Sequence, residues 1–180
     1  MSLLVIQLPP RDRLQARSPG SEAADGWRLP QEWSFVLSPD GLAVTQSGQA
    51  APALLPRADG VVLVLAEADV GWHRVPVPRA PAGRMRSALA GLMEEALLDD
   101  EEALHFALAP DAAPGREGWV AVTHRPWLAA ALAALEGAGR TVERVVPASQ
   151  PLTAPADVAR GHFFTIEGGA EATPWLTLAG

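Results

Sequence analysis

The sequence of 180 residues contains no cysteine, no lysine and no tyrosine. Without cysteine the chain can form no disulfide and offers no thiolate to a metal ion, which fits a protein of a reducing compartment. All 14 basic residues are arginine, a bias that a GC-rich genome explains most simply. The absence of lysine also excludes the phosphate-binding loop Gly-x-x-x-x-Gly-Lys-Ser/Thr, because that loop needs a lysine near its end.

Long apolar runs are missing as well. No stretch approaches the roughly 18–20 apolar residues that cross a bilayer, so we expect these 180 residues to be soluble. The N-terminal segment MSLLVIQLPPRDR does not resemble a signal peptide, because it has no basic region and its apolar run stops at Gln7 and Pro9. The chain ends at Gly180, directly after a strand-like segment, which suggests that it is cut from a longer protein.

The net charge of −7 is unevenly distributed along the chain. Residues 1–90 carry nine arginines and eight acids, whereas residues 91–180 carry five arginines and thirteen acids. Nucleic-acid binding needs a basic surface that displaces counterions, so the acidic second half argues against it. The same charge favours a basic protein partner.

The sequence carries no motif for catalysis or cofactor binding. It contains neither the Gly-x-Gly-x-x-Gly of dinucleotide sites nor the Gly-x-Ser-x-Gly of hydrolases. The four histidines are His73, His105, His124 and His162, and no two of them have the spacing of three or four residues that a helical metal site requires. We therefore expect no catalytic residue, no cofactor and no metal site.

The densest charged feature is a run of six acids in nine residues: Glu94, Glu95, Asp99, Asp100, Glu101 and Glu102. Paired carboxylates can act as acid and base or bind a divalent cation, but the glycine turn and alternating ligands of a calcium loop are missing. The run is either a solvated helix end or a docking surface. Acids near a helix C-terminus oppose the helix dipole, and this local cost favours a role in contacting a basic partner.

Short apolar segments separated by glycine and proline predict a mixture of strands and helices. The turn sequence Ser-Pro-Asp-Gly at 38–41 predicts a hairpin, the β-branched run at 61–65 predicts a strand buried on both faces, and residues 11–31 indicate a long surface loop. Strands are expected at residues 3–8, 33–37, 42–45, 61–65, 70–77, 104–109, 119–123, 141–146, 162–166 and 175–178.

Two helices are expected, at residues 85–98 and from Pro126 to Gly137 or Gly139. Apolar side chains at helical spacing predict the buried face of each helix. These side chains are Met85, Leu89, Leu92 and Ala96, with Met93 and Leu97 beside them, in the first helix, and Leu128, Leu132 and Leu135 in the second.

The order of segments from residue 61 to residue 147 resembles the cytoplasmic domain of the type II secretion system protein L family. The resemblance is carried by Trp-His-Arg-Val-Pro-Val-Pro at 72–78, Leu-Met-Glu-Glu at 92–95, Leu-His-Phe-Ala-Leu at 104–108, Val-Ala-Val at 120–122 and Val-Val-Pro at 145–147. Each piece alone is common, and their order and spacing carry the resemblance. Residues 1–60 match only in outline.

The resemblance implies an α/β protein with a degenerate actin-like, ribonuclease-H-like fold, in which mixed sheets carry flanking helices. It implies three parts: a partial first lobe at 1–66, an inserted α/β subdomain at 67–147, and a linker with the start of a second lobe at 148–180. In the family, one membrane helix and a small periplasmic domain follow, and neither is present in these 180 residues.

Actin-like ATPases hold phosphate with an Asp-x-Gly hairpin after the first strand. The corresponding residues 6–10, Ile-Gln-Leu-Pro-Pro, offer no acid for a metal ion, no glycine, and two prolines that lack an N–H donor. Gly168 and Gly169, after Glu167, align with the second phosphate hairpin, although a plain hairpin turn explains them more simply. We therefore expect a protein that is not an enzyme.

The resemblance further implies a non-catalytic scaffold of the type II secretion inner-membrane platform. In that family the domain recruits the secretion ATPase, protein E, to the cytoplasmic face of the bacterial inner membrane and pairs with the inner-membrane protein M. We expect the acidic run to contribute to docking, and attachment to the membrane only through a transmembrane helix absent from this chain. The sequence leaves open whether the domain forms a homodimer and which surface binds the ATPase.

Two alternatives remain open. An actin-like nucleotide-binding pilus assembly protein, similar to type IV pilus protein M, needs an intact phosphate hairpin, and residues 7–9 argue against one. An enzyme with a carboxylate site assembled around residues 94–102 should be stabilised by a divalent metal ion in a thermal melt.

Overall fold

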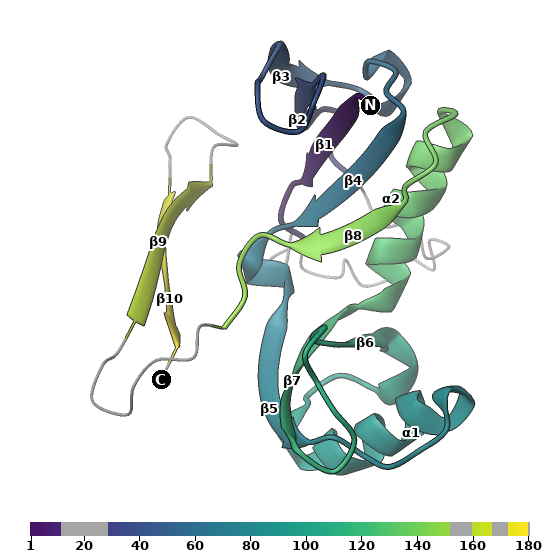
Figure 1. Cartoon of the computed structure of the whole chain (residues 1–180), viewed down its shortest axis with the longest axis vertical. Coiled ribbons are helices and arrows are strands. Elements are labelled where there is room, and N and C mark those ends of the chain that lie inside the picture. The colour runs from purple at the N-terminus through teal and green to yellow at the C-terminus, as the bar shows by residue number, and fades with distance from the viewer. Residues whose placement is uncertain (12–28, 152–159, 167–172, 180) are drawn as a thin grey trace, which may run out of the picture.

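The computed structural model describes residues 1–11, 29–151, 160–166 and 173–179, whose strands form three β-sheets (Figure 1). The largest sheet contains β1 (Leu3–Leu8), β2 (Trp33–Ser38), β3 (Gln46–Ala50), β4 (Gly60–Leu65) and β8 (Arg144–Pro147), in the order β3-β2-β1-β4-β8. β1, β4 and β8 are parallel, and β2 is antiparallel to both of its neighbours. This arrangement confirms the ribonuclease-H-like lobe that the sequence predicts.

One face of this sheet is buried beneath the helix α2 (Arg125–Gly137). Alternate residues of a strand point to opposite faces, and Leu4, Ile6 and Leu8 of β1 all point into this core without exposing any surface. The residues they pack with include Phe35, Val61, Leu63, Leu65, Trp127, Leu128, Ala131 and Leu135. The burial of Leu128 and Leu135 confirms the predicted face of the second helix.

A second core lies between the helix α1 (Ala82–Met93) and a three-stranded antiparallel sheet. This sheet contains β5 (Gly71–Pro76), β6 (Leu104–Leu108) and β7 (Glu117–His124), with β7 in the middle. The buried side chains of this core are Val75, Leu89, Met93, Leu104, Val120 and Val122. In Figure 1 this unit forms the lower end of the molecule, and β3 lies at the upper end.

The two cores divide the chain differently from the expected boundaries at residues 67 and 147. β8 pairs with β4, and α2 packs on the five-stranded sheet, so both elements lie with the first lobe. Only β5, α1, β6 and β7, together with the segments that join them, surround the second core. We propose a division in which residues 1–66 and 125–147 form the first lobe, 67–124 form the insert, and 148–180 form the linker and the start of a second lobe.

The hairpin after β2 differs from the prediction, because residues 42–45 are not a strand. The Asp40 carboxylate accepts hydrogen bonds from the backbone N–H groups of Leu42 and Ala43, each at 2.8 Å, and the Ser38 hydroxyl accepts one from Gly41 at 2.8 Å. These side-chain contacts hold the backbone in a turn and compete with strand pairing. The second strand of the hairpin therefore begins only at Gln46.

The first helix also differs from the prediction. It begins at Ala82 and ends at Met93, and a short 3₁₀ turn, η3 (Glu94–Ala96), follows it. Leu89, Ala90 and Met93 are buried, whereas Leu92 is 47% exposed. Each residue turns a helix by about 100°, so the buried arc centred near Leu89 and Met93 leaves Leu92 at its border. The prediction that Leu92 is a core residue is wrong.

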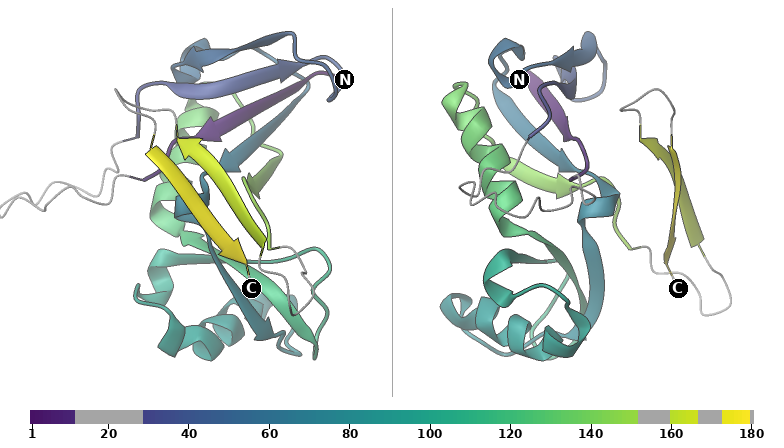
Figure 2. Two further views of the ribbon diagram at one scale, coloured as in Figure 1. Left: turned by 90° about the vertical axis from the view of Figure 1, so that its left-hand side faces the viewer. Right: turned by 180° about the vertical axis from the view of Figure 1, so that it is seen from behind.

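The remaining strands fall close to their predicted positions, although β8 begins three residues later than expected. β9 (Arg160–Ile166) and β10 (Thr173–Ala179) form the antiparallel hairpin expected at the start of a second lobe. Figures 1 and 2 place this hairpin on the side of the five-stranded sheet opposite α2. Residues 167–169, the candidate second phosphate hairpin, and most of the expected loop at 11–31 lie outside the described residues.

Core substitutions on α1 test the corrected helix face. We expect Leu89→Ala to lower the free energy of unfolding by about 2–5 kcal/mol, because it leaves a cavity in the second core. Leu92→Ala should lower it by only about 0.5–1 kcal/mol, because this side chain is already half exposed. Urea unfolding of both variants measures the difference. Equal losses from the two substitutions would contradict the helix face described above.

His124 forms the N-terminal cap of α2. Its Nδ1 atom accepts a hydrogen bond from the backbone N–H of Trp127 at 3.3 Å. Burial lowers the pKa of His124 below its ordinary value, and the Arg11 guanidinium lowers it further, while Asp99 and Asp69 oppose this shift. A lowered pKa keeps the imidazole neutral, which is the form that accepts the capping hydrogen bond.

Acidification should therefore weaken the fold through His124. Because its folded-state pKa lies below the ordinary value of 6.5, the unfolded chain binds the proton first, and stability falls as the pH drops from about 7 through the folded-state pKa. We expect His124→Asn, which keeps a capping oxygen but does not titrate, to match the wild type at pH 8 and to lose less stability by pH 5. Chemical unfolding at several pH values measures this, and parallel curves would contradict it.

Candidate docking surface

The six acids of the acidic run lie on the segment that joins α1 to β6. Glu94 and Glu95 belong to η3, and Glu101 and Glu102 belong to a second 3₁₀ turn, η4 (Glu101–Ala103), which leads directly into β6. All six side chains, which we call the acidic surface, are exposed: Glu94, Glu95, Asp99, Asp100, Glu101 and Glu102. The structure therefore brings every predicted site residue to one exposed connection of the insert.

Apolar contacts fix both ends of this connection. Met93 and Leu104 are buried in the second core, and Leu97 packs against the same core from the middle of the segment. The carboxylates are therefore carried by a backbone that is anchored at three points. A charged surface on an anchored segment loses little conformational entropy when a partner binds it.

Arg86 of α1 makes a fourth attachment, which the sequence did not indicate. Its Nη2 atom donates a hydrogen bond to the backbone oxygen of Glu101 at 2.6 Å, and its Nη1 atom lies 3.5 Å from the Glu101 carboxylate. An exposed ion pair of this kind contributes little to stability. Its effect is to hold η4 beside α1 and to compensate one of the six negative charges.

Leu98 lies inside the acidic run and is fully exposed, and Leu92 precedes it on the border of α1. The sequence predicts burial for Leu92 through its helical spacing, and it gives no role to Leu98. An apolar side chain surrounded by carboxylates is a feature that protein interfaces use, since apolar contact adds to electrostatic attraction. The acidic surface thus combines charged side chains with an exposed apolar side chain.

The carboxyl ends of β1 and β4 are the place where parallel α/β sheets usually bind ligands. In this chain, Pro9 and Pro10 follow β1 and supply no N–H group. Beyond them, the Asp69 carboxylate, which is buried at the end of β4, accepts a hydrogen bond from the backbone N–H of Arg11 at 2.8 Å. This contact joins the two chain segments that would otherwise line a phosphate site.

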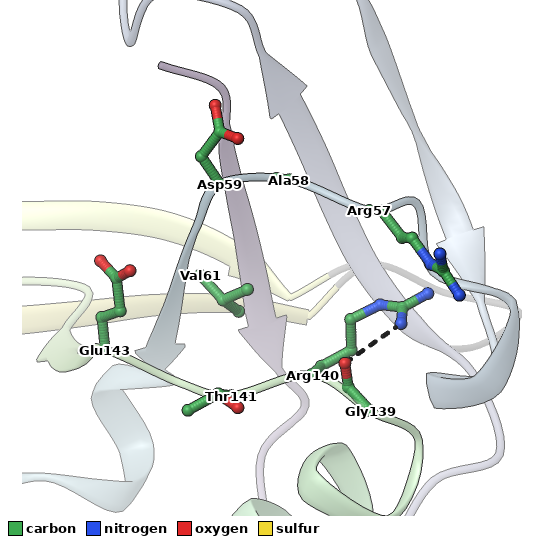
Figure 3. A pocket seen from close by; sticks show the side chains of 8 residues that line it. All are labelled: Arg57, Ala58, Asp59, Val61, Gly139, Arg140, Thr141 and Glu143. Atoms are coloured by element: carbon green, nitrogen blue, oxygen red, sulfur yellow. Dashed lines mark hydrogen bonds between the residues drawn. The ribbon is translucent and has the colours of Figure 1, made fainter.

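A shallow notch of about 270 Å³ lies at the opposite, amino ends of the parallel strands (Figure 3). Of the four charged side chains that line it, Asp59 and Arg140 are hydrogen-bonded within the fold. Asp59 accepts two hydrogen bonds from Ser2, at 2.7 Å and 3.0 Å. Arg140 donates to the backbone oxygens of Leu55, Ala138 and Gly139. These two side chains therefore join the amino ends of β1 and β4 and the segments that flank the notch.

The histidines are dispersed, as their spacing in the sequence indicates. His73 lies on β5, His105 on β6, and His124 at the start of α2. Burial lowers the pKa of His73, and burial together with Arg125 and Arg86 lowers the pKa of His105. Within the described ranges, no group of three or more His, Asp or Glu side chains is placed to hold a metal ion. Nor does any helix in the same ranges combine the length and apolar content that crossing a membrane requires.

Solved structures similar to this chain include the following two. The cytoplasmic domain of EpsL, an inner-membrane component of the type II secretion system of Vibrio cholerae, matches with a TM-score of 0.62 and 19% identity, over 98% of this chain and 71% of that one. This match supports the actin-like fold. A chain of a PilM–PilN type IV pilus biogenesis complex matches over 82% of this chain and 46% of its own length, with 20% identity and a TM-score of 0.45, a likeness too distant to bear on function.

The sequence comparisons agree with each other. Type II secretion system protein L of Pseudomonas aeruginosa is 47% identical over 66 residues, which are 37% of this chain and only 17% of that protein. The sequence model of the family described as type II secretion system protein L matches residues 30–158. Because this match spans well over half of the 180 residues, the chain belongs to the type II secretion system protein L family.

Proposed function

We propose that this domain is a non-catalytic scaffold that recruits the secretion ATPase, protein E, to the cytoplasmic face of the inner membrane and pairs with the inner-membrane protein M. Membership in the protein L family supports a role in type II secretion. The observation that carries the proposal further is the acidic surface, six exposed carboxylates on an anchored connection.

A basic domain of the ATPase is the partner that this surface fits best. Opposite charges speed the encounter of two proteins and select between partners, and the effect weakens as salt screens it. The exposed side chain of Leu98 adds an apolar contact at the centre of the charged segment. The partner should therefore present arginine or lysine side chains around an apolar site.

The residues at the carboxyl ends of β1 and β4 support the proposal that the domain is not catalytic. Two prolines follow β1, and Asp69 is engaged with the backbone of Arg11. A nucleotide would have to break this contact without finding N–H donors at Pro9 and Pro10 in return. The alternative of a nucleotide-binding pilus protein therefore has less support than the scaffold.

The first test concerns nucleotide. We expect the melting temperature of the chain to stay unchanged in millimolar Mg-ATP, because a ligand stabilises a protein only when it binds the folded state. Differential scanning fluorimetry with and without Mg-ATP measures this. An upward shift of several degrees would contradict the proposal that the domain is not a nucleotide-binding protein.

The second test concerns docking. We expect replacement of Asp99, Asp100, Glu101 and Glu102 by Asn or Gln to slow association with a basic domain of the ATPase by roughly ten-fold at low salt. The fold should remain intact because all four side chains are exposed. Surface plasmon resonance at low and high salt measures the association rate, and the difference between variant and wild type should shrink at high salt.

The matched control removes the same four charges elsewhere. Glu32, Asp111, Glu117 and Glu136 are exposed and lie outside the acidic surface. Their neutralisation changes the net charge equally, so its effect on association should be small. Equal slowing by both variants would mean that net charge alone attracts the partner. An unchanged association rate in both variants would mean that the acidic run is a solvated connection with no role in docking.

A further inference from the structure

Residues 70–93 contain no acid, although the net charge of the chain is −7. The basic residues of this segment are Arg74, Arg79, Arg84 and Arg86. Two of them have a carboxylate close by. Arg86 pairs with Glu101, and Arg74 lies on the same face of the sheet as Glu117, at a diagonal position across β5 and β7. The positive charge of the segment therefore remains uncompensated at Arg79 and Arg84.

The loop between β6 and β7 brings a further arginine, Arg116, to the segment that follows β5. The backbone N–H of Val77 donates a hydrogen bond to the oxygen of Arg116 at 2.9 Å, and the N–H of Gly115 donates one to the oxygen of Val77 at 2.8 Å. The Arg79 guanidinium lies directly over Gly115, since a Cβ there would be 2.6 Å from its Nε atom. Gly115 has a φ of +79°, so glycine is needed both for this turn and for the place that Arg79 takes.

Arg79, Arg84 and Arg116, which we call the basic surface, are all exposed. Within the described part of the chain, none of the three has an ion pair. Arg84 lies near the start of α1, whose first turn contains no acid. A positive charge there opposes the helix dipole, as do the acids that follow the carboxyl end of the same helix. These charges cost stability at both ends of α1, which favours a role in contacting partners.

We propose that the basic surface binds an acidic peptide segment of a protein partner. An arginine guanidinium presents several N–H donors in one plane and forms paired hydrogen bonds with a carboxylate. Arg79 and Arg116 are carried by two segments that are hydrogen-bonded to each other, so their spacing is fixed before a partner arrives. This contact uses different side chains from the acidic surface and takes a partner of the opposite charge, so it does not rest on the function proposed above.

An anionic membrane has the same charge as an acidic segment, and two observations favour the segment. The first is that the basic surface has no apolar side chain to insert between lipids. The large apolar side chains that the described residues expose lie elsewhere: Met1, Leu42, Val44, Leu54, Leu92, Leu98 and Val145. The second is that the same insert carries six exposed carboxylates, which an anionic membrane repels. A short segment can contact the three arginines without lying against these carboxylates.

A short fluorescein-labelled peptide of alternating Glu and Ser is the probe that tests the proposal. We expect the wild type to bind it at low salt and the variant Arg79→Gln/Arg84→Gln/Arg116→Gln to bind it roughly five-fold or more weakly, because charge-assisted hydrogen bonds are lost. Fluorescence anisotropy measures the affinity, which should fall as salt is added. The variant should melt as the wild type does, because the three side chains are exposed.

The matched control, Arg57→Gln/Arg125→Gln/Arg144→Gln, removes the same charge at three exposed positions outside the basic surface and should bind the probe as the wild type does. A peptide of Gln and Ser should not bind. In an NMR titration of the wild type, the probe should shift the amide resonances of residues 77–86 and 114–116. A wild type that does not bind the probe, or equal weakening in both variants, would overturn the proposal. So would binding to phosphatidylglycerol vesicles that needs the three arginines while the probe does not bind.

Discussion

The parallel pairing of β1 with β4 is the constraint on which the rest of the structure depends. Six consecutive residue pairs, from Leu3 with Gly60 to Leu8 with Leu65, join segments that are 57 residues apart. A side-chain contact secures each end of this pairing. At the amino end, Asp59 accepts hydrogen bonds from Ser2, which also lower the pKa of its carboxyl group, and at the carboxyl end Asp69 accepts one from Arg11.

The contact at the carboxyl end bears on whether this lobe can hold a ligand. In an open parallel sheet, the carboxyl ends of the strands form the usual crevice for ligands. Here the backbone N–H of Arg11 donates a hydrogen bond to Asp69 beyond these ends, and two prolines precede Arg11. The connection after α1, by contrast, is exposed and carries the acidic surface. An exposed charged surface of this kind supports the proposed role of docking a protein partner.

The sequence predicts most of this fold because the signals that form strands and helices are local. The β-branched run of β4 and the apolar spacing of α2 are examples, and their elements lie where expected. The sequence could not show that β8 pairs with β4, about 80 residues earlier, or that α2 packs on the same sheet, because both are contacts between distant segments. The sequence of residues 42–45 favours a strand, but hydrogen bonds from the backbone to Asp40 and Ser38 hold this segment in a turn. The charge of the acidic surface can be read from the sequence. Its attachment through Arg86 cannot, because it depends on α1 and η4 lying side by side in the fold.

The acidic surface lies outside both hydrophobic cores, although it is attached to one of them. Its carboxylates are exposed on the connection between α1 and β6, whereas Met93, Leu97 and Leu104 of the same segment pack in or against the second core. Partner binding and folding therefore depend on different side chains of one short segment. The apolar side chains hold the connection in place, and the carboxylates are free to change without disturbing the packing beneath them.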